Sequence, residues 1–305
     1  MKPEISVIIC THNPRKDYLD RVLEALRGQT VSLDRWELLV IDNASKEILA
    51  KSCDLGWHPN GRHVREDQVG LTHARLRAMR EAKSDLLLFL DDDNEVFPDY
   101  LEQGLKIEVE WPILGVWGGQ WFAEYEKGMP KDWTFDPWST HFKRDVWSNN
   151  YDRDVAPFGG GMFVRNKVAN VYVENSKNNP LKKLLGRKEG TLASYEDYDI
   201  AFTGCDLGLG MGRFLALKIT HLIPDARTTP EYCAKIREDS VYSEIIFRYS
   251  RGEKIIPESR VEEMLEFYKE LRMRFAGKDI TLYLAAKKGK KRALEYLKKM
   301  KNPAQ

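Results

Sequence analysis

The chain has 305 residues, of which 42% are hydrophobic and 31% are charged, and its formal net charge at pH 7 is +1. With a mean hydropathy of −0.51, this composition is typical of a soluble globular protein of one large or two modest domains. It excludes a collagen-like chain, and no apolar run approaches the roughly 18 residues that a membrane-spanning helix needs. The four cysteines show no CxxC spacing, and we expect no signal peptide before the first strand, so the sequence predicts a cytoplasmic protein.

The N-terminal part of the chain alternates strand-like and helix-like segments. Apolar runs predict strands over 5–10, 36–41 and 85–90, and apolar residues at helical spacing predict helices over 18–26 and 71–82. The third run lacks alternation, as expected of a central strand buried on both faces. Strand and helix in this order predict an α/β fold with a Rossmann-like, mostly parallel sheet flanked by helices.

The second part of the chain has a different composition. Residues 111–165 contain six of the eight tryptophans, followed by a strand over 215–223 and helical periodicity from Glu231 onward. We therefore expect a domain over 1–230 and a C-terminal helical extension over 231–305. The tryptophans supply either core packing or flat surfaces for an acceptor sugar or lipid. They lack the interleaved basic residues of nucleic-acid platforms, so we expect no nucleic-acid partner.

The chain ends in a basic segment. Lys287 to Lys301 holds eight basic residues and one acid, a local charge of +7. One interpretation is a solvated helix end. The other is electrostatic contact with a polyanion or with an anionic membrane, which would place the protein peripherally on the inner face of that membrane.

Polar residues follow three of the predicted strands, where a parallel sheet places its ligand sites. They are Thr11–Asn13, Asp42–Asn43 and Asp91–Asp93. Three consecutive carboxylates repel one another unless a cation neutralises them, and Mg²⁺ or Mn²⁺ prefers such oxygen ligands. If the strand stays extended, Asp91 and Asp93 face the same side and act together. The alternative is a surface turn in which Asp92 or Asn94 caps a following helix.

Other candidate residues lie further along the chain. Glu196–Asp197 is either a general base or a favourable pair of charges at a helix N-terminus. Phe158–Gly161 permits close approach of a ligand to the main chain, or forms a tight turn without one. His221 and Arg227 fit a metal ligand and a phosphate partner, although a lone histidine or arginine is more often structural or exposed.

Six segments in this order resemble the family 2 glycosyltransferases, which have the GT-A fold. The segments are 3–13, 40–45, 70–75, 89–93, 159–165 and 196–199. The resemblance extends over about residues 3–230 and leaves the helical extension outside it.

The resemblance implies a role for each matching residue. Those implied to bind the nucleotide or its diphosphate are Thr11, His12, Asn13, Asp42, Gly70, Arg75, Asp91, Asp92 and Arg227, with Asp42 holding the base. Asp93 and His221 are implied to bind the metal ion, Mn²⁺ or Mg²⁺. Asp197, paired with Glu196, is implied to be the catalytic base.

The implied activity is a metal-dependent, inverting glycosyl transfer from a nucleotide-diphosphate sugar to a hydroxyl group. A UDP-sugar is the expected donor, with GDP and dTDP as other carriers, and a glycan, lipid-linked or other molecule is the acceptor. Two alternatives stay open at this point: a nucleotidyltransferase, and a non-catalytic protein that binds sugar nucleotides.

Overall fold

Three apolar strands form the centre of the sheet in the computed structural model, which describes residues 2–256 and 259–301. They are β1 (Ile5–Thr11), β2 (Trp36–Asn43) and β4 (Leu86–Leu90), and every residue in them is buried. β1 lies between the other two and is parallel to both. Burying each large apolar side chain contributes about 1.5–3 kcal/mol, so these strands make a stable platform. The three strands and the helices between them confirm the sequence prediction.

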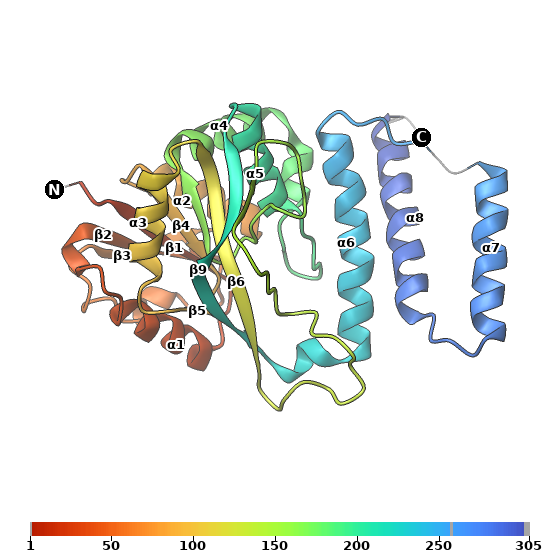
Figure 1. The fold of residues 1–305 in the computed structure, drawn as a ribbon, viewed down its shortest axis with the longest axis horizontal. Coiled ribbons are helices and arrows are strands. Elements are labelled where there is room, and N and C mark those ends of the chain that lie inside the picture. The colour runs from red at the N-terminus through yellow and green to blue at the C-terminus, as the bar shows by residue number, and fades with distance from the viewer. Residues whose placement is uncertain (1, 257–258, 302–305) are drawn as a thin grey trace. The chain divides into compact units, whose positions relative to one another are not determined.

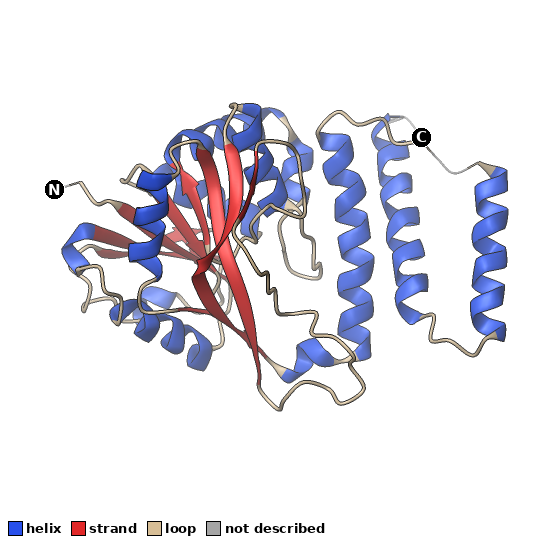
Figure 2. Ribbon diagram, viewed as in Figure 1, coloured by secondary structure: helices blue, strands red, loops and turns tan. Residues whose placement is uncertain are grey.

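Within the described residues, nine strands form one mixed sheet in the order β3-β2-β1-β4-β8-β6-β9-β5, with β7 paired to β9 (Figures 1 and 2). The remaining strands are β3 (Gly61–Glu66), β5 (Asn94–Val96), β6 (Leu114–Tyr125), β7 (Val146–Ser148), β8 (Met162–Arg165) and β9 (Gly210–Ile223). β3 continues the parallel part, whereas β8 is antiparallel to both β4 and β6. The predicted α/β fold is confirmed, but β9 begins earlier than the predicted strand over 215–223.

Helices cover both faces of this sheet (Figure 2). They are α1 (Lys16–Arg27), α2 (Leu71–Glu81), α3 (Tyr100–Glu110), α4 (Asn166–Asn178) and α5 (Glu196–Asp206). α1 and α3 share one hydrophobic cluster with Ile5, Val7 and Ile9 of β1. α2 packs on α4, and α4 on α5. Alternate side chains of a strand point to opposite faces, so the buried strands support both layers of helices.

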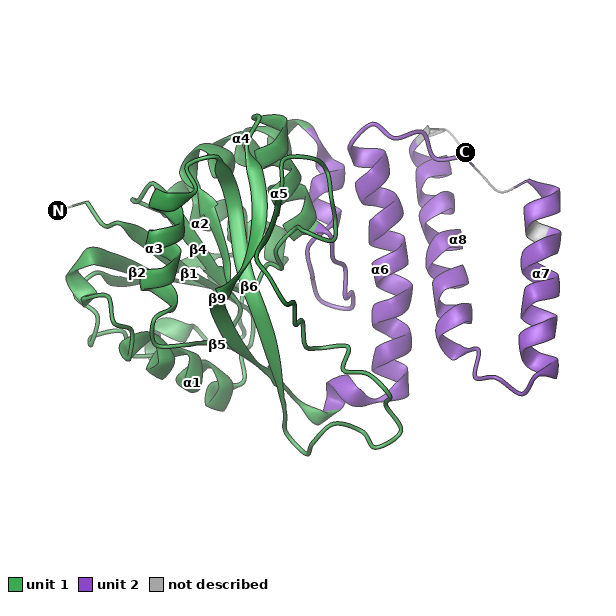
Figure 3. Cartoon of the chain, in the orientation of Figure 1, with its two compact units in different colours: residues 1–178, 196–225 green, residues 179–195, 226–305 purple. Residues whose placement is uncertain are grey.

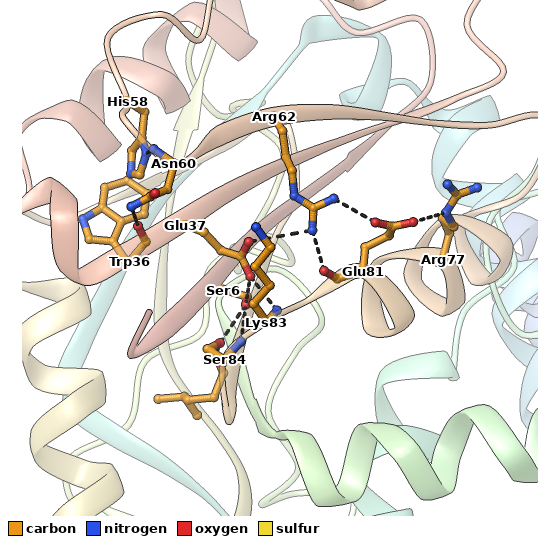
Figure 4. A network of polar contacts seen from close by, with 11 residues as sticks. Ser6, Trp36, Glu37, His58, Asn60, Arg62, Arg77, Glu81, Lys83 and Ser84 are labelled. Atoms are coloured by element: carbon orange, nitrogen blue, oxygen red, sulfur yellow. Dashed lines mark hydrogen bonds and ion pairs between the residues drawn. The ribbon is translucent and has the colours of Figure 1, made fainter. Parts of the chain in front are cut away.

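A buried polar network ties the strands together away from their carboxyl ends (Figure 4). The Glu37 carboxylate is 1% exposed and accepts hydrogen bonds from the Ser6 hydroxyl, at 2.5 Å, and from the Lys83 backbone N–H, at 2.6 Å. Arg62 of β3 forms an ion pair with the same carboxylate at 3.7 Å. Because a buried charge is costly unless it is paired, this network fixes how β1, β2 and β3 align.

The chain forms two units, residues 1–178 with 196–225, and residues 179–195 with 226–305 (Figure 3). The second unit contains η3 (Pro180–Leu184), α6 (Pro230–Ser250), α7 (Arg260–Phe275) and α8 (Thr281–Lys301). The sequence predicted a single break after residue 230 and did not anticipate that 179–195 belongs with the C-terminal helices. None of the helices in the described part of the chain is long and apolar enough to cross a membrane.

The basic segment of α8 is engaged within the second unit. Arg292 pairs with both Glu238 and Asp239 of α6, and Lys288 pairs with Glu238 at 2.8 Å. Asp239 is fully buried. A Cβ atom at Gly289 would lie 2.1 Å from the carbonyl oxygen of Glu238, so this glycine lets α8 approach α6 closely. Part of the positive charge therefore holds two helices together, and contact with a membrane stays a prediction.

Candidate active site

The carboxyl ends of β1 and β2, and the turn after β4, bring the predicted residues together at one edge of the sheet. Thr11 and Asp42 are register partners in the β1–β2 pair. The Thr11 hydroxyl donates a hydrogen bond to the Asp92 carboxylate. This edge lies within the first unit.

The turn after β1 is held by the loop after β2. The Asn13 side chain accepts from the Lys46 backbone N–H at 2.8 Å, and Asn13 has a positive φ of 50°. His12 Nδ1 lies 2.6 Å from the Asn43 carbonyl oxygen. The Asn43 side chain in turn accepts from the Gly70 N–H at 2.8 Å. Gly70, with a φ of 134°, is the N-cap residue of α2, so these bonds fix three predicted nucleotide-binding positions relative to one another.

Asp42 is a buried acceptor with several donors. It accepts from the backbone N–H groups of Ser45, at 3.0 Å, and Leu49, at 3.2 Å, and from the Arg65 guanidinium, at 2.7 Å. Burial alone would raise the pKa of Asp42, but the hydrogen bonds from Ser45, Arg65 and Leu49 outweigh it, and the pKa is lowered. Asp42 is therefore ionised at neutral pH.

The aspartate triplet forms a turn, which corrects the expectation of an extended strand. The Asn94 N–H donates to the Asp91 carbonyl oxygen at 3.2 Å, and β5 follows immediately. Asp91 therefore faces Arg75, at 3.5 Å, whereas Asp93 faces His221 of β9, at 3.8 Å. The alternative of a helix cap at Asp92 or Asn94 is wrong as well, because α3 begins only at Tyr100.

Arg75 of α2 links the triplet to the second pair of carboxylates. Its guanidinium is 4% exposed and lies 3.4 Å from Glu196 at the start of α5 as well as 3.5 Å from Asp91. Burial raises the pKa of Glu196 to about 7, against the effect of Arg75, and the neighbouring Asp197 raises it further. Burial also raises the pKa of Asp197, and Arg75 opposes that shift. Such shifted carboxyl groups in one cluster are typical of catalytic sites.

The glycine segment packs between these two clusters. A Cβ atom at Gly159 would lie 2.6 Å from an Arg75 nitrogen, and one at Gly160 would lie 1.9 Å from Asn94 Oδ1 and 2.9 Å from Asp91 Oδ2. The Gly159 N–H donates to Asp197 Oδ2 at 3.2 Å. Only glycine lets the chain pass this close to the triplet while it holds Asp197.

Comparison with known proteins identifies this arrangement. The model of the family described as "Glycosyl transferase family 2" matches residues 6–163, more than half of the chain and most of the elements that build the site. The chain belongs to this family. The match includes the aspartate triplet and Gly159–Gly161, but ends before Asp197 and His221.

Individual relatives match over about half of the chain. Polypeptide N-acetylgalactosaminyltransferase 8 of Drosophila melanogaster is 35% identical over 148 residues, which are 44% of this chain and 25% of that protein. Glycosyltransferase AglE of Haloferax volcanii is 27% identical over 170 residues, 54% of each chain. The chain thus spans between a quarter and about half of these two relatives. A crystal structure of S. aureus TarS residues 1–349 in complex with UDP has a TM-score of 0.51 at 15% identity, covering 81% of this chain and 70% of that one, and so supports the fold.

The residues of the site fit a divalent cation at Asp93 and His221. Asp93 Oδ2 and His221 Nε2 lie 3.8 Å apart, and both side chains are buried, at 8% and 6% exposure. A carboxylate with an imidazole suits Mn²⁺ better than Mg²⁺, which prefers oxygen ligands alone. Among the described residues no group of three or more His, Cys, Asp or Glu side chains converges on one point. Two protein ligands would leave positions for substrate oxygens and water.

The tryptophan segment divides between core and site. Trp117 of β6 is fully buried and stacks on Phe163, with ring centroids 5.6 Å apart. Trp121 and Trp138 instead approach His221 edge-on, at 4.8 and 6.0 Å. The core interpretation is therefore confirmed for Trp117, whereas a flat surface for an acceptor at Trp121 and Trp138 stays a prediction.

Sequence reasoning missed two residues at this edge and could not place a third. Arg65 lies in β3, a strand that was not predicted, and the buried Asn94 was considered only as a helix cap. Knowledge of the strand register would have identified both residues, because Arg65 is the register partner of Asp42 and Asn94 is the register partner of His221. Arg227 lies in η4 (Asp225–Thr228) and belongs to the second unit, so its assignment to the diphosphate stays a prediction.

Proposed function

We propose that the protein is a metal-dependent, inverting glycosyltransferase that moves a sugar from a UDP-sugar to a hydroxyl group of a glycan, lipid-linked or other acceptor. The observation that carries this proposal is the linkage of Asp91, Arg75 and Glu196 beside Asp197. The linkage connects Asp91, which is suited to the diphosphate side of the donor, to the Glu196–Asp197 pair, which is suited to the acceptor side. The TarS crystal structures with UDP and with UDP-GlcNAc support a UDP-sugar as the donor class.

In the proposed reaction Asp197 is the general base. The acceptor oxygen forms a bond to C1 of the sugar, the bond from C1 to the diphosphate oxygen breaks, and its electron pair leaves with the nucleoside diphosphate. The acceptor proton passes to an Asp197 oxygen. Asp197 suits this role better than Glu196, because Glu196 is 2% exposed and faces Arg75 while Asp197 is half-buried. Its raised pKa makes it a better proton acceptor than an ordinary aspartate.

On the donor side, the leaving diphosphate gains negative charge as the bond to C1 breaks. A cation at Asp93 and His221 would act as a Lewis acid that stabilises this charge. The Thr11 hydroxyl keeps the Asp92 carboxylate in place beside Asp93. Arg75 holds Asp91 while it is itself enclosed by Gly159. We therefore assign Arg75 a positioning role here rather than direct contact with the nucleotide.

The product of the reaction tests the proposal. Incubation with UDP-sugars and Mn²⁺ is expected to release UDP, whereas release of pyrophosphate would indicate a nucleotidyltransferase. Asp197→Asn is expected to lower kcat by at least 100-fold while UDP affinity changes little. Asp20→Asn, on the exposed surface of α1, is the matched control and should keep full activity. If Asp197→Asn keeps wild-type turnover, another residue is the base, and a chain that binds UDP-sugars without turnover would be a binding protein.

We also propose a cytoplasmic location with peripheral contact at a membrane through Lys287–Lys301. The exposed side chains of Lys291, Lys298 and Lys299 support the contact, because each basic group near an anionic surface adds about 1 kcal/mol. Sedimentation with anionic phosphatidylglycerol vesicles, compared with neutral phosphatidylcholine vesicles, tests it. Lys298→Glu with Lys299→Glu is expected to abolish any preference for the anionic vesicles, and equal sedimentation with both vesicle types in the wild type would contradict the contact.

A further inference from the structure

The side of α7 that contacts α8 is polar. The Tyr283 hydroxyl of α8 donates a hydrogen bond to the Glu266 carboxylate, and Lys287 of α8 pairs with Glu270 at 3.0 Å. A surface helix normally does the reverse, because it turns its apolar side toward the protein and its charged side toward solvent. Polar groups therefore hold α7 on α8.

An apolar stripe runs along the remaining length of α7. Its members recur at alternating steps of three and four residues, with one further leucine beside them: Val261, Met264, Leu265, Tyr268, Leu271 and Phe275. We call these six residues the α7 stripe. Leu271 is partly buried, and the exposed fractions of the other five run from 50% for Met264 to 88% for Phe275.

The α7 stripe faces away from α8. Successive residues of an α-helix are about 100° apart, so Tyr268, near the middle of the stripe, points about 160° away from both Glu266 and Glu270. Steps of three and four residues are the pattern by which one helix packs along another in a coiled coil. A continuous exposed stripe of this kind is typical of an interaction surface, and its spacing fits a second helix.

The charges of α7 divide between its two halves. Residues 260–267 carry one base and three acids, a net charge of −2, whereas residues 268–275 carry three bases and one acid, a net charge of +2. Two copies of the helix packed antiparallel place the acidic half of each against the basic half of the other. A parallel pair instead places like charges together. The two halves sum to zero, so α7 itself adds no attraction to an anionic membrane.

We propose that α7 is a self-association surface, on which α7 of a second copy of this chain packs antiparallel. Such a contact is isologous: each copy presents the same stripe, and the two-fold axis passes near Tyr268. Val261 of each copy then lies near Phe275 of the other. The helix has 16 residues and is about 24 Å long, which makes a small interface, so we expect dissociation in the micromolar range.

Sedimentation velocity of the full-length protein tests the association. Over about 1–200 µM the chain of 35.4 kDa is expected to shift toward twice that mass. Leu265→Glu with Tyr268→Glu should raise the dissociation constant by at least about 30-fold. Both side chains are exposed, so the variant should fold, which far-UV circular dichroism checks. Val109→Glu, at an apolar side chain of α3 that is 79% exposed, is the matched control and should leave the dissociation constant unchanged.

Cross-linking with a short bis-maleimide tests the orientation of the pair. A mixture of Val261→Cys and Phe275→Cys chains is expected to give a covalent dimer. Each variant alone should give no more than the wild type, whose four native cysteines set the background. Arg272→Glu with Arg274→Glu makes both halves of α7 acidic and should raise the dissociation constant about 10-fold at low salt.

Three outcomes would overturn the proposal. The first is a wild type that stays at 35.4 kDa up to about 200 µM, and the second is a dimer that Leu265→Glu with Tyr268→Glu leaves intact. The third is cross-linking of Val261→Cys alone, which would show a parallel pair. If a monomeric wild type instead sediments with phosphatidylcholine vesicles and the Leu265→Glu, Tyr268→Glu variant does not, the stripe binds lipid and the pairing is wrong.

Discussion

Replacing Arg75 by methionine should destabilise the protein by an amount that depends on pH. Arg75 is 4% exposed and lies within 3.5 Å of both Asp91 and Glu196. Methionine keeps most of the side-chain length but removes the charge. Leaving a buried carboxylate such as Glu196 without its cation typically costs about 3–5 kcal/mol in the free energy of unfolding, and we expect this loss at pH 8.

The pH dependence follows from the pKa of Glu196, which is raised from 4.5 to about 7 in the folded chain. Between these values the folded chain holds a proton that the unfolded chain releases, so stability falls as pH rises, in the wild type as in the variant. Above about pH 7 the wild type releases this proton. The variant lacks the cation that favours ionised Glu196, so its pKa is higher. Above about pH 7, the free energy of unfolding of the variant therefore falls further below that of the wild type, by about 1.4 kcal/mol for each pH unit, until the pH passes the pKa of Glu196 in the variant.

Urea unfolding at pH 6, 7, 8 and 9, followed by tryptophan fluorescence, measures this difference. All eight tryptophans lie between residues 36 and 147, so the signal reports on the first unit. Arg77→Met, which removes a partly exposed ion pair on the same helix, is the matched control and should cost less than about 1 kcal/mol at every pH. Adding Glu196→Gln to the Arg75→Met variant should reduce the slope above pH 7. A stability difference that stays constant from pH 6 to 9 would refute this account of the Arg75–Glu196 pair.

Three further substitutions probe other parts of the structure. Gly160→Ala places a methyl group 1.9 Å from Asn94 Oδ1, so it should lower the free energy of unfolding by about 1–3 kcal/mol and weaken UDP binding. In the control Gly28→Ala the added methyl group meets only ordinary contacts, and neither quantity should change. Equal unfolding midpoints for Gly160→Ala and the wild type would contradict the close packing. Glu37→Gln should lower the free energy of unfolding by about 1–3 kcal/mol. It should leave kcat/KM unchanged, because the Glu37 network lies away from the site. A large loss of kcat/KM in a variant of full stability would contradict that separation. Arg292→Met leaves the buried Asp239 without its arginine and should lower the thermal unfolding midpoint of the second unit, measured by calorimetry. An unchanged midpoint would show that Lys235 alone is enough to pair the Asp239 carboxylate.

The fold was predictable where the sequence is continuously apolar. β1, β2 and β4 are buried throughout, and their composition alone indicates central strands. β3 escaped prediction because its sequence, Gly-Arg-His-Val-Arg-Glu, contains one buried apolar residue, Val64. Its pairing comes from register with β2 rather than from a hydrophobic pattern. A tertiary contact thus decided what local periodicity could not.

The candidate site was predictable as a set of residues and not as a set of contacts. The aspartates, Asp42 and Asp197 stand out because carboxylates at strand and helix ends are conspicuous. The ion pair between Arg75 and Glu196 joins residues 121 positions apart, and nothing local in the sequence reports it. The turn at Asp91–Asp93 is closed by a backbone hydrogen bond from Asn94 and likewise leaves no periodic signature.

Residues 179–195 make the two units inseparable by a single cut of the chain. This segment leaves the first unit after α4, and its Leu192 and Ser194 N–H groups bond to Asp239 and Ser243 of α6. It then returns through Tyr195, whose φ of 82° is unusual for a residue other than glycine, directly into Glu196 and Asp197. Deleting the C-terminal helices would therefore remove the α6 partners of Leu192 and Ser194, in the segment that continues directly into Glu196 and Asp197.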